Sequence, residues 1–135
     1  MRDIAYAAGD AIMVVYRTDF DSERKDDGSP VTLADTAAEA IILPGLRALT
    51  PDIPVVSEEE HAEGSSPTEI GDRFWVVDPL DGTREFLKRN DEFTVNIGLI
   101  ENNIPIFGVL YAPALNLMYA GTLNGGATLI EGDKP

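Results

Sequence analysis

The chain contains no cysteine, only one histidine, and 10 Lys and Arg residues against 24 Asp and Glu in 135 residues. Without cysteine there are no disulfides and no thiolate ligands, so a bound metal is expected to be held by oxygen. The single histidine, His61, lies in a polar stretch where histidines are seldom ligands, and we assign it no role. The lack of cysteine is compatible with a reducing cytosol.

The scarcity of basic residues leaves a net charge of -14. A nucleic-acid polymer or an anionic membrane surface is therefore an unfavourable partner, whereas cations are favoured. The sequence also lacks an apolar run long enough to span a membrane, and its N-terminus has no cleavage signal. We expect a soluble, unprocessed protein without a transmembrane segment.

The apolar pattern predicts two helices in the first third of one globular unit, residues 1–135. Apolar residues at helical spacing predict a first helix up to about Tyr16. Thr32 followed by Asp35 resembles a capping box, which predicts a second helix with Asp35 in its first turn. Pro44 and Gly45 should kink that helix or end it early.

Short apolar or alternating runs predict strands over 53–57, 73–77, 93–99, 104–111, 117–121 and 127–130. Gly108 marks an expected bulge, and Asn124-Gly125 is a strong tight-turn dipeptide. The predicted fold class is α+β, with two helices packed on a mostly antiparallel sheet.

The stretch 74–83, FWVVDPLDGT, runs an apolar strand into two acids three residues apart, Asp78 and Asp81. Pro79 should end the strand, because it has no backbone N–H for a ladder and biases the preceding residue toward an extended conformation. The chain must then turn where the acids lie. Two carboxylates in such a turn can hold hard divalent cations through oxygen.

Gly82 and Thr83 complete this motif. Gly82 allows backbone conformations closed to other residues, and Thr83 can cap a short helix that contains Phe86 and Leu87. Their N–H groups would face an anion at the helix start, so the motif as a whole fits a phosphate bound through a metal. The alternative is an ordinary solvated turn, since Asp-Pro, Asp-Gly and Thr are common turn residues.

A run of three acids, Glu58-Glu59-Glu60, follows the predicted strand 53–57. Such a run is usually a solvated face, because like charges repel unless a cation is present. A solvated face is therefore the ordinary interpretation of the run taken by itself.

Three ordered motifs together resemble the inositol monophosphatase superfamily of magnesium-dependent, lithium-sensitive phosphatases: Pro30-Val31-Thr32 with Asp35, Ser57-Glu58-Glu59, and residues 75–83. Residues 82–90, 92–97 and 111–113 are most similar to its CysQ-type branch of 3'(2'),5'-bisphosphate nucleotidases. The resemblance implies a cytoplasmic enzyme of sulfur metabolism, alternatively peripheral at the inner membrane, that hydrolyses adenosine 3',5'-bisphosphate to AMP and phosphate. The implied fold is the N-terminal half of the layered αβαβα sugar-phosphatase fold.

The resemblance also implies residue roles around two or three Mg²⁺ ions. The implied metal ligands are Glu58, Asp78, Asp81 and the backbone carbonyl of Leu80. The implied substrate contacts are Glu58, Leu80, Asp81, Gly82 and Thr83. The implied catalytic residues are Asp35, Glu58 and Thr83. The Thr83 hydroxyl orients the attacking water, and Asp35 supports that water or a further metal. Glu59 is either a base for the same water or a solvated side chain. Metal activation of the water and charge neutralisation on the phosphoryl group agree with this chemistry.

The sequence departs from the family pattern in three places. Pro44-Gly45 interrupts the second helix, and Asp91 stands where the branch commonly has glycine. The family also continues with a second half, carrying a Trp-Asp motif, that is absent from these 135 residues. The chain alone is therefore expected to be weakly active or inactive and to form a homodimer or aggregate through exposed apolar surface. Inositol or sugar monophosphatase activity and a non-catalytic cation-binding fragment are the alternatives.

Overall fold

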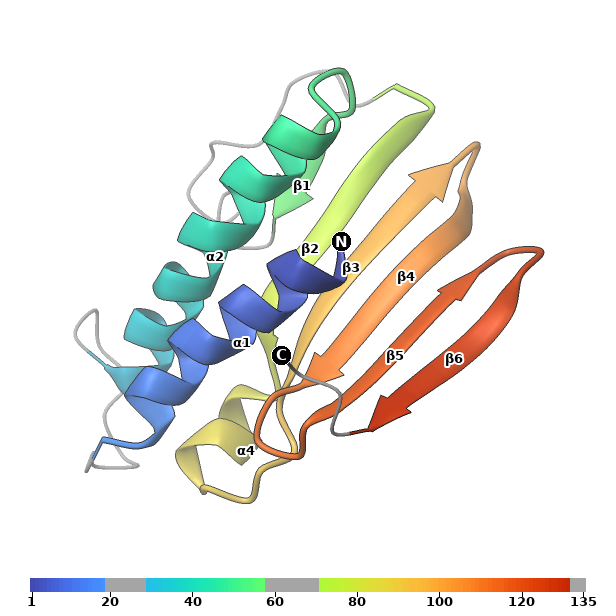
Figure 1. Ribbon diagram of the computed structural model, residues 1–135. Helices are drawn as coiled ribbons and strands as arrows, with labels where there is room; N and C mark the ends of the chain where they lie inside the picture. Colours follow the sequence, from blue (N-terminus) through green and yellow to red (C-terminus); the bar gives the residue numbers. More distant parts are fainter. Residues whose placement is uncertain (19–28, 58–70, 132–135) are drawn as a thin grey trace.

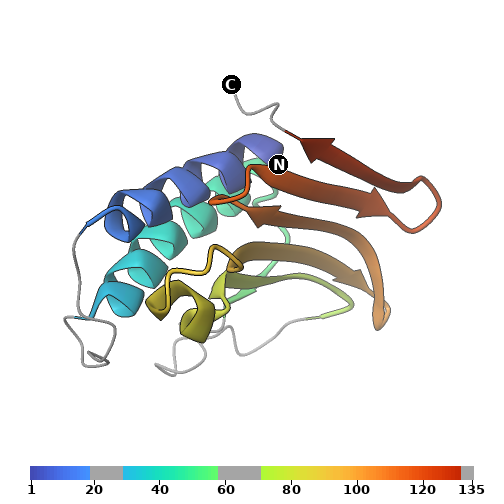
Figure 2. The same cartoon turned by 90° about the horizontal axis from the view of Figure 1, so that it is seen from below.

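The computed structural model describes residues 1–18, 29–57 and 71–131. Two long helices, α1 (Arg2–Tyr16) and α2 (Pro30–Leu49), lie side by side on one face of a six-stranded sheet (Figure 1). In the described part of the chain the opposite sheet face carries no helix, as the turned view in Figure 2 shows. The α+β class predicted from the sequence is confirmed.

The strands follow one another across the sheet in chain order. β1 pairs in parallel with β2, and every later pairing is antiparallel. A short helix, α4 (Thr83–Leu87), separates β2 from β3 in the sequence. The strands are β1 (Val55–Ser57), β2 (Arg73–Asp81), β3 (Thr94–Glu101), β4 (Ile104–Ala112), β5 (Leu117–Thr122) and β6 (Gly126–Glu131).

The core lies between the two long helices and the sheet. Ile12 of α1, Leu46 of α2 and Val77 of β2 are each at most 1% exposed. Gly9 lets α1 approach the sheet closely, because a Cβ there would come 2.3 Å from the ring of Tyr111. Burial of these apolar faces drives the packing of the helices on the sheet.

The second helix differs from its prediction at both ends. Its N-cap is Ser29, whose Oγ accepts a hydrogen bond from the Thr32 backbone N–H at 3.1 Å, and Pro30 is the first helical residue. Thr32 is therefore not the cap, and Asp35 lies in the second turn. Helix α2 also continues through Pro44 to Leu49. Pro44 removes one helical hydrogen bond, but burial of the flanking apolar side chains offsets that cost.

The bulge expected at Gly108 lies elsewhere. Gly108 pairs directly with Gly98, and the register between β3 and β4 shifts instead between Leu99 and Ile100, which leaves Ile106 as the extra residue. The Asn124-Gly125 turn between β5 and β6 forms as predicted. No helix in the described part of the chain is both long and apolar enough to cross a membrane.

Candidate metal and phosphate site

Strand β2 does not end at Pro79 but runs on to Asp81. Asp78 is opposite Asn96 and Asp81 is opposite Thr94, so three steps along β2 match two steps along β3. This register shift is a bulge, and a bulge accommodates a proline that a regular central ladder would reject. The prediction that Pro79 ends the strand is therefore wrong, although the local change of direction that it required is present.

The bulge separates the environments of the two acids. Asp78 is half-buried, whereas Asp81 is exposed. Between them Leu80 is only 2% exposed and belongs to the hydrophobic core, so its side chain anchors the bulged segment to the body of the protein. The two carboxylates therefore project from a backbone segment that is fixed by packing.

Gly82 follows with φ +92°, in the left-handed region. A Cβ at this position would lie 3.2 Å from the Phe93 Cα and 3.3 Å from the Glu92 carbonyl oxygen, so both conformation and space favour glycine. Gly82 itself is the N-cap of α4, and Thr83 is the first helical residue rather than the predicted cap. Helix α4 has only five residues, so the structure offers little helix dipole for an anion.

Thr83 and the start of α2 face a common cavity of about 260 Å³. Its lining residues are Ser29, Val31, Thr32, Thr83, Arg84 and Leu87. Asp35 lies three residues after Thr32 on α2 and is 8% exposed. The structure thus brings the predicted hydroxyl of Thr83 to the beginning of the helix that carries Asp35.

Strand β1 ends beside the point where the acidic segment of the parallel strand β2 begins. Ser57 is in register with Val77, the residue before Asp78. Glu58 follows Ser57 in the sequence, but Glu58, Glu59 and His61 lie outside the described residues. In residues 1–18, 29–57 and 71–131, no three acidic or histidine side chains come close enough together to hold a metal ion. The predicted convergence of Glu58 with Asp78 and Asp81 stays a prediction.

Two polar contacts beside these acids were not foreseen from the sequence. The Ser57 hydroxyl, fully buried, donates a 2.6 Å hydrogen bond to Glu39 Oε2 on α2. The Asn96 amide on β3 donates a 3.2 Å hydrogen bond to Asp81 Oδ2. Glu39 lies one helical turn after Asp35, and this i, i+4 spacing was the one signal in the sequence that could have identified it.

A clamp formed by Tyr16, Arg89 and Asp91 ties the segment after α4 to the end of α1. The Tyr16 hydroxyl donates to Asp91 Oδ1 at 2.6 Å and accepts from the Asp91 N–H at 3.2 Å. Arg89 donates to the Tyr16 carbonyl at 2.7 Å and also to the Thr18 carbonyl. Burial, followed by the hydrogen bond to Asp91, raises the pKa of Tyr16 to about 12.

The donor set of β2 fits a hard divalent cation. Asp78 and Asp81 supply carboxylate oxygen, and Pro79 and Leu80 have no register partner on β3. Asn96 Oδ1 is buried and has no hydrogen-bond partner among the described residues, which leaves one further oxygen acceptor beside the acids. Oxygen ligands of this kind are those that Mg²⁺ prefers in proteins.

The sequence profile of the inositol monophosphatase family matches residues 1–134, and the chain belongs to that family. It is 56% identical over 119 residues to the 3'(2'),5'-bisphosphate nucleotidase CysQ of Escherichia coli (strain K12), covering 87% of this chain and 48% of the relative. The corresponding CysQ of Buchnera aphidicola is 47% identical over 122 residues, 87% of this chain and 44% of the relative. The chain thus spans about half the length of the curated relatives that it matches.

Solved structures give the same relationship. The crystal structure of CysQ from Bacteroides thetaiotaomicron superposes with a TM-score of 0.81 at 38% identity, over 97% of this chain and 47% of that one. An inositol monophosphatase from Anabaena superposes with a TM-score of 0.76 at 31% identity, over 94% of this chain and 44% of that one. The predicted fold family is confirmed.

Proposed function

We propose that this chain provides the metal-binding half of a magnesium-dependent phosphomonoesterase that converts adenosine 3',5'-bisphosphate to AMP and phosphate. The observation that carries the proposal is the bulged end of β2, where Asp78 and Asp81 flank the anchored Leu80 beside Asn96. The curated relatives reported above, named as bisphosphate nucleotidases, support the substrate class. A small phosphorylated nucleotide in the cytoplasm is the partner that this proposal implies.

The ligands that we propose for Mg²⁺ are Glu58, Asp78, Asp81 and the Leu80 carbonyl. Bound Mg²⁺ would supply charge neutralisation at the phosphoryl group and would acidify a water molecule. Two or three ions are the number that the resemblance implies. The acidic end of β2 would otherwise repel a phosphate, so substrate binding at this end requires cations.

The protein's own residues would position the water and the phosphate. In our proposal the Thr83 hydroxyl orients the attacking water, and Asp35, on the helix that borders the same cavity, supports that water or a further metal ion. The backbone of Gly82 and Thr83 would contact a phosphate oxygen. The left-handed conformation of Gly82, with φ +92°, sets the turn in which these backbone groups lie.

Release of phosphate from adenosine 3',5'-bisphosphate tests the proposal. We would assay this chain, and the same chain extended by the half of Escherichia coli CysQ that it does not match, with and without saturating Mg²⁺. We expect Mg²⁺-dependent turnover by the extended protein and little by the chain alone, because part of the metal shell and the substrate pocket would be missing. Turnover that is independent of Mg²⁺, or equal in both proteins, would contradict the proposal.

A second candidate function has its own support, because one structural neighbour is named an inositol monophosphatase. The same assay with inositol phosphate separates the two, and faster release from inositol phosphate would favour this alternative. If Mg²⁺ binds but neither substrate turns over, a non-catalytic cation-binding role would be favoured instead.

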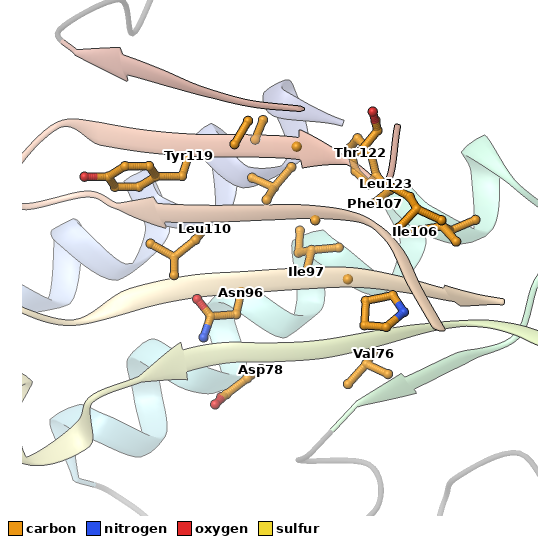
Figure 3. Close-up of a pocket in the computed structure, with 17 residues that line it drawn as sticks. Val76, Asp78, Asn96, Ile97, Ile106, Phe107, Leu110, Tyr119, Thr122 and Leu123 are labelled. Atoms are coloured by element: carbon orange, nitrogen blue, oxygen red, sulfur yellow. The ribbon is translucent and has the colours of Figure 1, made fainter. Parts of the chain in front are cut away.

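We also propose that the chain on its own associates into a homodimer through the sheet face opposite α1 and α2. That face presents Val76 at 42%, Leu110 at 39% and Tyr119 at 47% exposure. A contiguous apolar patch of this kind is a common site of association. These side chains line a hollow of about 650 Å³. Figure 3 shows how they lie on the sheet.

A further inference from the structure

Asn96 lies on the open sheet face, between the carboxylate of Asp78 on one side and apolar side chains on the other. It is opposite Asp78 on β2 and opposite Leu110 on β4. Figure 3 shows Asp78 and Asn96 on adjacent strands, at one end of the hollow that Val76, Leu110 and Tyr119 line. Asparagine is depleted in strands, so a packing role alone gives little reason for its presence here.

The contacts of Asn96 join both acids of the motif. Its backbone is in register with Asp78, and its side-chain amide donates a hydrogen bond to Asp81 Oδ2 at 3.2 Å. The bulge makes this geometry possible, because it brings Asp81, three residues after Asp78, back within reach of the same β3 residue. One side chain therefore spans the interval between the two carboxylates.

We propose that Asn96 is a positioning residue for the metal site, an inference that rests on the proposed function. Its amide N–H fixes the exposed Asp81 carboxylate in one orientation, which reduces the entropy that a cation would have to remove on binding. Its Oδ1, buried and without a hydrogen-bond partner in the described part of the chain, is the acceptor for a water of hydrated Mg²⁺. Such partners of metal ligands orient them and tune metal affinity.

Two substitutions at Asn96 separate this role from a structural one. Asn96→Ala removes both the donor and the acceptor, and we expect the Kd for Mg²⁺, measured by titration calorimetry, to rise on the order of 10-fold. Asn96→Asp replaces the donor by a third carboxylate that repels Asp81. Without metal, the melting temperature of this variant should lie below that of wild type, and adding Mg²⁺ should raise it by more than it raises that of wild type.

Asn124 provides matched controls. It is exposed in the turn between β5 and β6, three strands away from β2. Asn124→Ala and Asn124→Asp make the same chemical changes and the same change in net charge. Both variants should leave the Kd for Mg²⁺ and the stabilisation by Mg²⁺ as in wild type. If Asn124→Asp and Asn96→Asp changed the stabilisation by Mg²⁺ equally, net charge alone would explain the effect, and the proposal would be overturned.

A metal-free measurement keeps the inference separate from the proposed function. Three-bond NMR couplings should report a single Asp81 side-chain rotamer in the wild type and averaged rotamers in Asn96→Ala. If the wild type binds no Mg²⁺ but Asp81 loses its single rotamer in the variant, the proposed function fails and the positioning role stands. If Asp81 is equally ordered in both proteins, or Asn96→Ala binds Mg²⁺ as tightly as wild type, the positioning role is wrong.

Discussion

Replacing Tyr16 by phenylalanine removes one hydroxyl and leaves the aromatic packing of the clamp in place. The ring of Tyr16 stays against Phe86 and Phe93, whose centroids lie 5.2 and 4.6 Å away. What is lost is a donated bond of 2.6 Å and an accepted bond of 3.2 Å, both with Asp91. A hydrogen bond to a charged group contributes about 1.5–3 kcal/mol, and the partial exposure of Asp91 places the loss near 1.5 kcal/mol. The melting temperature should fall by about 6 °C.

The same hydroxyl gives this prediction a pH signature. The pKa of Tyr16 is raised from 10.0 to about 12, first by burial and then by the hydrogen bond to Asp91. Above pH 10 the unfolded chain loses this proton while the folded chain retains it, so the contribution of Tyr16 to stability falls as pH rises through the folded pKa. The advantage of wild type over Tyr16→Phe should therefore be full below pH 10 and shrink above it.

Urea unfolding followed by the fluorescence of Trp75, the only tryptophan, measures both effects. The two proteins would be compared at about pH 8 and at about pH 11, on either side of the ordinary tyrosine pKa. Tyr119→Phe is the control, because Tyr119 is 47% exposed and its substitution should cost little. Equal stability of wild type and Tyr16→Phe at the lower pH, or a difference that is the same at both values, would refute the role assigned to the hydroxyl.

Two further substitutions test the backbone around the candidate site. Gly82→Ala should lower the free energy of unfolding by about 1–2 kcal/mol from left-handed strain alone, and by more from the contacts of the added Cβ. Gly71→Ala isolates the strain, because Gly71 has φ +72° and a Cβ there would meet no atom within 4 Å among the described residues beyond its chain neighbours. Equal losses at the two glycines would contradict the steric argument. Ser57→Ala removes the donor to the Glu39 carboxylate and should cost about 1–3 kcal/mol in urea unfolding. Glu39→Gln keeps an acceptor for Ser57 and should cost much less, and the reverse order would exclude this hydrogen bond as the cause.

The predictions about proline have a common physical origin. The sequence predicts that Pro79 ends its strand and that Pro44 kinks its helix or ends it early, because each lacks the N–H that a helix or ladder uses. Neither element ends at its proline. In α2 the loss is one hydrogen bond, and burial of Leu43 and Leu46 keeps the helix continuous. In β2 the proline lies inside a bulge, which depends on pairing with β3 and is therefore invisible in the local sequence.

The candidate site could also be predicted only where its residues are close together in the sequence. Asp78, Asp81 and Gly82 could be predicted because they lie within one five-residue segment, and their residue types and spacing indicate their chemistry. Two neighbouring contacts could not be predicted, the hydrogen bond from Asn96 to Asp81 and that from Ser57 to Glu39. They arise from strand register and from the packing of α2 on the sheet. Pairings between residues 15 and 18 positions apart leave no periodic trace in a single sequence.

The open sheet face yields the last prediction, which concerns association. Leu110 and Tyr119 are cross-strand partners on this face, 39% and 47% exposed. Replacing both with lysine should abolish a concentration-dependent dimer in sedimentation velocity, because the charges would have to be desolvated at the interface. Folding should be little affected, since neither side chain is buried.

The helix layer supplies the control for this experiment. Val14 and Leu33 are 67% and 53% exposed and belong to α1 and α2. Lysine at both positions makes the same change in net charge, from -14 to -12, but leaves the open face intact. If dimerisation is lost in the helix variant and retained in the sheet variant, the interface lies on the helices. If the wild type stays monomeric up to the solubility limit, the apolar face alone is insufficient to hold two copies together.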